Sequence, residues 1–371
     1  MSVKVLGLID CFNNPGFGPM TQHRAIASTS FLGRYAFIDI QLSNFLNSGI
    51  PSIGILCQNH IRSLSRHVGN GRFWINNTKT GDFQVLYDEP HVANPGYSTD
   101  VNCLLENRWF LKQVNPDYVV IASPFMVFEQ NFNDLLNDHI ASGNRISLLY
   151  THATGLKSSF INSTKLSISE RGKITKMEPN RGDTDEGDVA LGCAILDYPM
   201  LESLLEYATG TSNFFGLKDT LQYLSPSVLM RAVKVNGYVR SFDSLSHYLK
   251  YSLELLDENI FNSLFADDWK IYTKSYDTPP TLYKAGSSVK NSSIANGSII
   301  EGTVINSVLG RGVTVKKGCV IKNSVIGSNA VIDVNTHIEN AVVDKDAQVL
   351  HISEVVGTLD NPLYIARGDI V

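Results

Sequence analysis

Cysteine and histidine side chains are the first candidates for metal, redox or nucleophilic chemistry. The five cysteines are Cys11, Cys57, Cys103, Cys193 and Cys319, and they are scattered along the chain without a CxxC or HxxxH pair. Zinc sites and disulfide frameworks need close, paired spacings. The sequence therefore supports neither a disulfide framework nor a zinc site.

The elements that could position a site alternate between strands and helices in the first 245 residues. Short β-branched runs at 3–9, 53–56, 118–122 and 146–150 predict buried strands. Amphipathic stretches at 102–114 and 133–141, and a helix at 40–47 that ends before Gly49, separate them. This β-α-β order predicts a largely parallel sheet covered by helices. Ligands bind such sheets beyond the carboxyl ends of strands, so chemistry is expected in the loops after Ile9 (which contains Asn13–Gly16) and Ala122.

A different pattern starts near Ala285. Aliphatic residues recur there mostly at six-residue steps, at Ile294, Ile300, Ile305, Leu309, Val315, Ile321, Ile326, Ile332, Ile338, Val343 and Val349. This period predicts a parallel β-helix of hexapeptide repeats, with a β-sandwich of short strands as the alternative. We predict three parts: a sheet domain (1–245), a helical linker (246–284, with a helix over 245–261) and a β-helix domain (285–371).

Composition limits the classes of partner. The chain has 371 residues, a formal net charge of −5, and no run of 18 apolar residues. These values argue against nucleic-acid binding and against a transmembrane helix. The first residues lack the pattern of a secretion signal, so we expect a cytoplasmic protein that binds neither nucleic acid nor membrane.

Three segments carry a family resemblance. Residues 38–50 (IDIQLSNFLNSGI), 63–69 (SLSRHVG) and 302–309 (GTVINSVL) resemble stretches of ADP-glucose pyrophosphorylases, also called glucose-1-phosphate adenylyltransferases. The resemblance implies a nucleotidyltransferase-type sheet domain followed by a left-handed β-helix. It also implies a reaction in which glucose 1-phosphate attacks the α-phosphate of ATP, aided by Mg²⁺, basic side chains and backbone N–H groups.

The residues that this reaction needs are missing at the matching positions. The family's GGxGxRL phosphate loop matches 10–17, where Cys11 and Phe12 replace the paired glycines and Gly16 replaces the arginine. Bulky side chains obstruct the close backbone approach that a phosphate requires. The lysine of the family's EKP stretch is absent from Met177-Glu178-Pro179, and Ile26 replaces a second lysine.

The two aspartates that hold Mg²⁺ in the family are also replaced. Phe125 stands at the first position, within Ala122–Met126, and Ser241 stands at the second, with Asp243 two residues away. Mg²⁺ prefers anionic oxygen ligands. We therefore predict that the Mg²⁺ cofactor site is lost, with no catalytic residue and no metal ligand retained.

Two functions follow from the resemblance, and a third from the repeat. The first is a non-catalytic, GlgD-type regulatory subunit that assembles, as a tetramer, with the catalytic ADP-glucose pyrophosphorylase subunit and tunes ADP-glucose synthesis for glycogen. The second is an active adenylyltransferase that uses Asp10, Asp243 or Glu178 as substitutes. The third is a hexapeptide acyltransferase with His337 or His351 as base, although a lone histidine on a coil corner is ordinarily just solvated.

A ligand site can survive without catalysis. Residues 21–25 (TQHRA) match the TNKRA stretch in which some members bind a sugar-phosphate effector, and Arg34 occupies the place of a family lysine. The resemblance implies an effector site at His23, Arg24 and Arg34, where arginine suits phosphate and His23 adds charge at lower pH. Ordinary solvated side chains are the alternative. The effector hypothesis predicts that Arg24→Ala weakens the effector response and leaves assembly intact.

Overall fold

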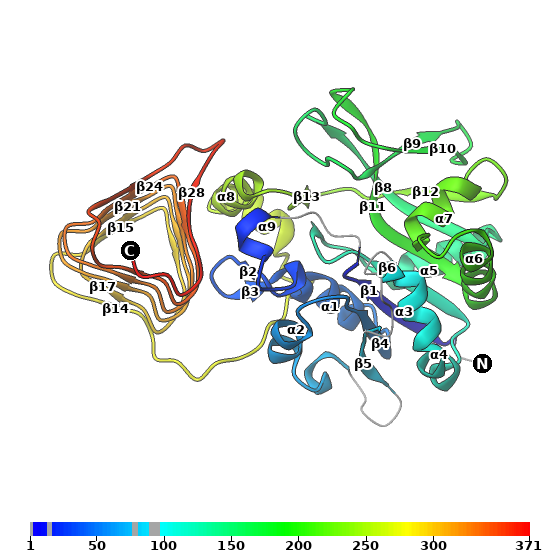
Figure 1. Cartoon of the computed structure of the whole chain (residues 1–371), viewed down its shortest axis with the longest axis horizontal. Coiled ribbons are helices and arrows are strands. Elements are labelled where there is room, and N and C mark those ends of the chain that lie inside the picture. The colour runs from blue at the N-terminus through cyan, green and yellow to red at the C-terminus, as the bar shows by residue number, and fades with distance from the viewer. Residues whose placement is uncertain (1–2, 13–16, 76–80, 89–96) are drawn as a thin grey trace.

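The computed structural model describes residues 3–12, 17–75, 81–88 and 97–371. Figure 1 shows a β-helix beside a layered sheet domain, with α8, α9 and the β2–β3 hairpin between the two. The loop prediction at Asn13–Gly16 lies outside the described residues. In the described part of the chain, no helix is long and apolar enough to cross a membrane.

The sheet domain is built around the strand β1 (Val5–Asp10). This strand pairs in parallel with β4 (Ser52–Leu56) and β6 (Tyr118–Ala122), and β4 pairs in parallel with β5 (Phe83–Leu86). These strands confirm the predictions at 3–9, 53–56 and 118–122 to within two residues. Their carboxyl ends meet at one sheet edge, as the β-α-β order predicted.

The other half of the sheet is mixed rather than parallel. The long strand β11 (Glu186–Asp197) runs antiparallel to β6, to β8 (Ile146–Thr154) and to β9 (Thr164–Ile168). Two further strands, β10 (Ile174–Pro179) and β12 (Met230–Lys234), extend this half. A separate two-stranded sheet joins β7 (Met126–Phe128) to β13 (Val239–Ser241).

Helices cover both faces of the sheet. One buried cluster contains side chains of α1 (Phe37–Asn47), α2 (Ile61–Val68) and α5 (Phe132–Ser142). The cluster on the opposite face contains side chains of four other helices, α3 (Asp100–Glu106), α4 (Arg108–Val114), α6 (Tyr198–Thr211) and α7 (Leu217–Leu224). Short 3₁₀ turns lie at Gly18–Thr21, Ile26–Ser28 and Arg72–Trp74.

Two helix predictions needed correction because each stretch breaks in the middle. The amphipathic stretch 102–114 is two helices, α3 and α4, since Asn107 leaves helical geometry and donates its side-chain amide to the Cys103 carbonyl at 2.8 Å. The predicted helix 245–261 is likewise two, α8 (Leu245–Glu254) and α9 (Glu258–Leu264). Asp257 caps the start of α9, because its carboxylate accepts hydrogen bonds from the Asn259 and Ile260 N–H groups.

The C-terminal part is a left-handed parallel β-helix of hexapeptide repeats, as predicted. Each of its three sheets has five short strands. The first comprises β14 (Leu282–Tyr283), β17 (Ile299–Ile300), β20 (Thr314–Val315), β23 (Val331–Ile332) and β26 (Gln348–Val349). The second comprises β15 (Ser288–Lys290), β18 (Thr303–Ile305), β21 (Val320–Lys322), β24 (His337–Glu339) and β27 (Glu354–Val356). The third comprises β16 (Ser293–Ile294), β19 (Val308–Leu309), β22 (Val325–Ile326), β25 (Ala341–Val343) and β28 (Leu363–Ile365).

The repeat pattern predicts the core positions of the β-helix correctly, with one exception. Ile305 points outward, in a column with Lys290 and Lys322, and Val304 takes the fully buried inward place. The predicted steps from Ile300 to Leu309 are five and then four residues, whereas the buried positions Ile300, Val304 and Leu309 are four and then five residues apart. The short step therefore falls one side of the coil earlier than predicted.

The third sheet faces the sheet domain. Its outward column runs from Ser293 through Val308, Val325 and Val342 to Tyr364. The three valines are buried in the same cluster as side chains of α1 and α8. A hairpin of β2 (Ser30–Phe31) and β3 (Tyr35–Ala36) also reaches the β-helix. These contacts position the site described below.

Candidate functional site

A cleft lies at the sheet edge where the sequence predicted chemistry. It encloses about 490 Å³ and is lined by Asp10 and Phe12 after β1 and by Ser123 and Phe125 after β6. Both phenylalanines thus line the cleft at the predicted sheet edge. A benzyl side chain offers no hydrogen bond to a phosphate oxygen. The wall is mainly apolar, with Met177 and Leu221 among the lining residues.

The cleft offers a triphosphate little positive charge. Asp100 lines it, is buried, and accepts hydrogen bonds from the Val101 and Leu217 N–H groups at 2.8 and 3.0 Å. Burial, reinforced by the neighbouring Asp10 carboxylate, raises the pKa of the Asp100 carboxyl. Lys218 is the one basic residue in the described lining, but it donates to the Asn162 carbonyl at 2.6 Å, and burial lowers its pKa.

The residues present do not fit Mg²⁺. Among the described residues, no group of three His, Cys, Asp or Glu side chains could hold a metal ion. Asp10 and Asp100 are the acidic residues in the described lining, and Asp100 favours its protonated form, which is a poor ligand for a hard cation. The cleft therefore has no described set of side chains through which a bound Mg²⁺ could act.

The other substitute acids lie elsewhere. Asp243 contacts the His247 ring, and Glu178 pairs with Lys176, and neither lines the cleft. Ser241 is fully buried on β13 and also lies outside the lining. Asp10 is thus the single substitute candidate that the fold brings to the cleft.

A second, strongly basic pocket lies between the sheet domain and the β-helix. We call it the basic pocket, and it encloses about 270 Å³. Its cationic lining residues are Arg24, Arg34, Arg66, Arg311, Lys345 and Arg367. Asp346 is the acidic residue in the described lining, and it pairs with Arg367 at 3.3 Å. Such an excess of guanidinium and ammonium groups suits a phosphate or carboxylate ligand.

Arg24 forms one wall of this pocket through a buried ion pair. Its guanidinium contacts the Asp344 carboxylate, which also accepts a hydrogen bond from the Tyr364 hydroxyl at 2.7 Å. The Arg24 side chain is 6 % exposed and that of Asp344 is 2 % exposed. The pair joins two domains across 320 residues of sequence. Arg24 therefore has a structural role, and Arg24→Ala would not isolate an effector response as the sequence had suggested.

Arg34 reaches the pocket from the β2–β3 hairpin. The hairpin touches the β-helix at Gly33, which has a φ of +67° and whose added Cβ would lie 2.5 Å from the Leu309 carbonyl oxygen. Arg311 then donates to the Arg34 carbonyl at 3.1 Å. The Arg34 guanidinium itself is exposed and has no ion pair among the described residues. It is thus available to a ligand.

Sequence reasoning found part of this pocket. The structure brings the predicted Arg24 and Arg34 to it, while His23 is exposed and lies outside the lining. It adds Arg66 and His67, which lie in the resembling segment 63–69, where no ligand role was assigned. His67 contacts the buried Asp39 carboxylate at 2.6 Å.

The β-helix contributions were missed, although the coil length contains a signal for them. The 17-residue coil places Arg311, Ser328 and Lys345 at equivalent positions in three successive coils, so two cations gather at one corner. Burial, together with the nearby Arg24 guanidinium, lowers the pKa of Lys345 to about 8. Neither His337, which pairs with Glu339 at 3.3 Å, nor the exposed His351 lines the cleft or the basic pocket.

Family models match both halves of the chain. Residues 17–159 match a model described as nucleotidyl transferase. Residues 282–360 match a model described as GlmU-like, C-terminal hexapeptide. The two matches fall on the sheet domain and on the β-helix.

Curated relatives match nearly the whole chain. A glucose-1-phosphate adenylyltransferase of a Thermotoga species (strain RQ2) is 30% identical over 82% of this chain and 73% of its own length. That of Thermosipho africanus is also 30% identical, over 82% of this chain and 74% of its own. That of Bacillus cytotoxicus is 29% identical over 94% of both chains. With this identity and coverage, and with the fold and both domain matches in agreement, the chain belongs to the glucose-1-phosphate adenylyltransferase family.

Proposed function

We propose that this chain is a non-catalytic regulatory subunit of glucose-1-phosphate adenylyltransferase. It would assemble with a catalytic homologue and tune the formation of ADP-glucose for glycogen synthesis. The observation that carries the proposal is the lining of the cleft, where Phe12 and Phe125 stand beside two carboxylates and one engaged lysine.

The chemistry of adenylyl transfer explains why this lining matters. Catalysis of phosphoryl-type transfer consists mainly of positioning and of neutralising negative charge on phosphate oxygens. Removing one such electrostatic contact typically costs about 10²–10³ in rate. Here the cation, the metal ligands and the open backbone approach are all replaced. The losses need not multiply, but together they leave Lys218 as the one cation in the described lining, and its ammonium is engaged by the Asn162 carbonyl.

The basic pocket supports a regulatory role. It is built from both domains, so an anion bound there would change how the sheet domain sits against the β-helix. Exposed Arg34 and Arg66 are free to bind phosphate oxygens, while Arg24 is held in its ion pair. A sugar phosphate fits this chemistry, because its phosphate groups meet the cations and its hydroxyls meet polar side chains of the lining such as Ser328.

Assembly is supported by apolar side chains on the outside of the β-helix. Leu282 and Tyr283 on the first coil, and Ile370 beside the last coil, are more than half exposed. Exposed large apolar side chains favour contacts with another subunit. A tetramer that contains catalytic and regulatory chains is the assembly that we propose.

The test is co-expression with a catalytic homologue from the same organism. We expect the two chains to co-purify, and native mass spectrometry to give a mixed tetramer. The response of ADP-glucose formation to fructose 1,6-bisphosphate should differ between the complex and the catalytic chain alone. Arg34→Ala should reduce this response, and the matched control Arg171→Ala should leave it unchanged, because only Arg34 lines the basic pocket.

Two results would reject the proposal. One is failure of the chains to co-purify, with the kinetics of the catalytic chain unchanged. The other is ADP-glucose formation by this chain alone that disappears in Asp10→Ala, since Asp10 lines the cleft. The second result would favour the alternative of an active enzyme with a substitute carboxylate.

A further inference from the structure

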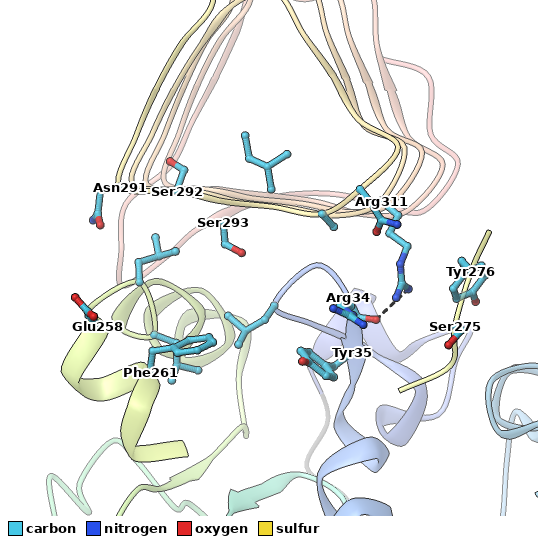
Figure 2. Close-up of a pocket in the computed structure, with 16 residues that line it drawn as sticks. Arg34, Tyr35, Glu258, Phe261, Ser275, Tyr276, Asn291, Ser292, Ser293 and Arg311 are labelled. Carbon is cyan, nitrogen blue, oxygen red and sulfur yellow. Dashed lines mark hydrogen bonds between the residues drawn. The ribbon is translucent and has the colours of Figure 1, made fainter. Parts of the chain in front are cut away.

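A groove separate from the cleft runs between the first coil of the β-helix and helix α9. It encloses about 720 Å³, a volume typical of small-molecule sites. Figure 2 shows the β-helix forming one wall and α9 with the β2–β3 hairpin forming the other. We call it the first-coil groove.

The groove exists because the packing between the domains stops one coil short. In the later coils, the outward column of the third sheet presents Val308, Val325 and Val342, all of them buried against the sheet domain. In the first coil the same column presents Ser293, which is exposed. A small polar side chain thus stands where a valine would continue the apolar contact. Figure 2 shows Ser293 pointing out of the β-helix into the groove.

The opposite wall is apolar. Leu32 and Leu255 are almost fully buried beneath it, at 8 % and 2 % exposed. Phe261 is 40 % exposed, and its ring stacks on Phe265 with centroids 4.5 Å apart. One face of the Phe261 ring is thereby fixed, and the rigid ring offers its remaining surface to the groove. A flat apolar surface is therefore present before any ligand binds.

The polar groups are spread along the groove and carry both signs of charge. Figure 2 shows Glu258 at one end, Arg34 nearer the middle, and Ser275 and Tyr276 beyond it. Within the described residues, no hydrogen bond or ion pair engages the side chains of Glu258, Arg34, Ser275 or Ser293. These four side chains can donate to and accept from a ligand. The mixture does not select for a strongly charged molecule.

We propose that the first-coil groove binds a neutral oligosaccharide of about two to three hexose units. A pyranose ring has an apolar C–H face and a rim of hydroxyls that both donate and accept, which matches an apolar wall opposite hydroxyl and amide groups. The Glu258 carboxylate and the Arg34 guanidinium suit hydroxyls as well, because each can form paired hydrogen bonds with neighbouring hydroxyl groups. Anions are drawn instead to the basic pocket, where four further cations lie.

The two sites are joined by shared residues. Arg34 and Arg311 line both the groove and the basic pocket. Arg311 donates to the Arg34 carbonyl at 3.1 Å and lies over the Tyr276 ring, 4.5 Å from its centroid. A sugar that binds Arg34 must change the availability of the Arg34 guanidinium to an anion in the basic pocket. By linkage, each ligand then alters the affinity for the other by the same factor.

The test is calorimetric titration of the full chain with maltotriose and cellotriose. We expect at least one of them to bind, and Ser293→Val to weaken this binding by tenfold or more. Valine continues the buried column, so the variant should fold at least as well as the parent. Ser288→Val is the matched control, because Ser288 is exposed on β15, which belongs to a different sheet of the same coil. Phe261→Ala should also weaken binding.

Three outcomes overturn the inference. They are no binding of either sugar at millimolar concentration, binding that Ser293→Val and Phe261→Ala leave unchanged, and a weakening by Ser293→Val of fructose 1,6-bisphosphate binding alone. None of them bears on whether the chain assembles with a catalytic homologue. The proposed regulatory function therefore stands or falls by its own experiment.

Discussion

The cleft in the sheet domain and the basic pocket at the domain junction differ most in where they hold charge. The cleft has two carboxylates and a lysine engaged by a carbonyl, whereas the basic pocket gathers six cations around one acidic residue. The difference teaches that two sites of one fold can have very different charge. In this chain, the cationic side chains that suit an anion lie at the junction between the domains.

The largest effect is expected from breaking the ion pair that forms a wall of the basic pocket. Arg24→Ala should leave the buried Asp344 carboxylate without its guanidinium and destabilise the chain by about 3–5 kcal/mol. Chemical denaturation of the single variant measures this loss. The double variant Arg24→Met/Asp344→Leu removes both charges and should recover most of the stability. A loss below about 1 kcal/mol in Arg24→Ala would contradict a structural role.

The next prediction concerns anion binding and distinguishes the basic pocket from the cleft. Fructose 1,6-bisphosphate should bind the chain, and Arg34→Ala should weaken it by about tenfold or more, because hydrogen bonds between charged partners contribute about 1.5–3 kcal/mol. Calorimetric titration is the measurement. Arg171→Ala, at an exposed position between β9 and β10, should leave the affinity unchanged. Equal losses in both variants would indicate only a general charge effect.

A third prediction concerns stability and the cleft. The pKa of Asp100 is raised on folding, so the native chain holds this proton more tightly than the unfolded chain does. Stability therefore falls as the pH rises from the unfolded pKa near 4 through the raised native pKa. Asp100→Asn imitates the protonated carboxyl and should stabilise the chain at pH 9 by at least about 1 kcal/mol relative to the parent. Urea denaturation at pH 6 and pH 9 measures this. If Asp100→Asn stabilises the chain no more at pH 9 than at pH 6, the raised pKa of Asp100 is contradicted.

The smallest effect is the pH dependence of the basic pocket. Lys345 has its pKa lowered to about 8, so it loses its charge as the pH rises through that value. The affinity for fructose 1,6-bisphosphate should fall several-fold between pH 7 and pH 9. Lys345→Gln should bind more weakly at pH 7 and show a flatter profile. An undiminished slope in this variant would assign the dependence to another group.

Much of the fold could be predicted from local patterns. The strands of the parallel half and the aliphatic column of the β-helix follow from periodicity, which is a local property. Ile305 was misplaced because Val304 and Ile305 are adjacent aliphatic residues, and the repeat pattern alone does not decide which of them takes the short step from Ile300. The break at Asn107 was also missed, since its cause is a side-chain hydrogen bond within one turn.

The basic pocket was less predictable because it is assembled from distant segments. Arg24 and Arg34 were found through family resemblance, yet the partner that buries Arg24, Asp344, is 320 residues away. Whether an arginine is free or paired depends on such tertiary contacts and not on its neighbours in sequence. Coil length places Arg311 and Lys345 at one corner of the β-helix, but nothing in the sequence indicated that this corner would meet Arg24.

Formation of ADP-glucose by the purified chain alone is the measurement that tests the proposed loss of catalysis most directly. ATP, glucose 1-phosphate and Mg²⁺ are supplied in excess, and a catalytic homologue is assayed alongside. The account predicts no product above the protein-free blank. Steady turnover by this chain, abolished by Asp10→Ala, would contradict it.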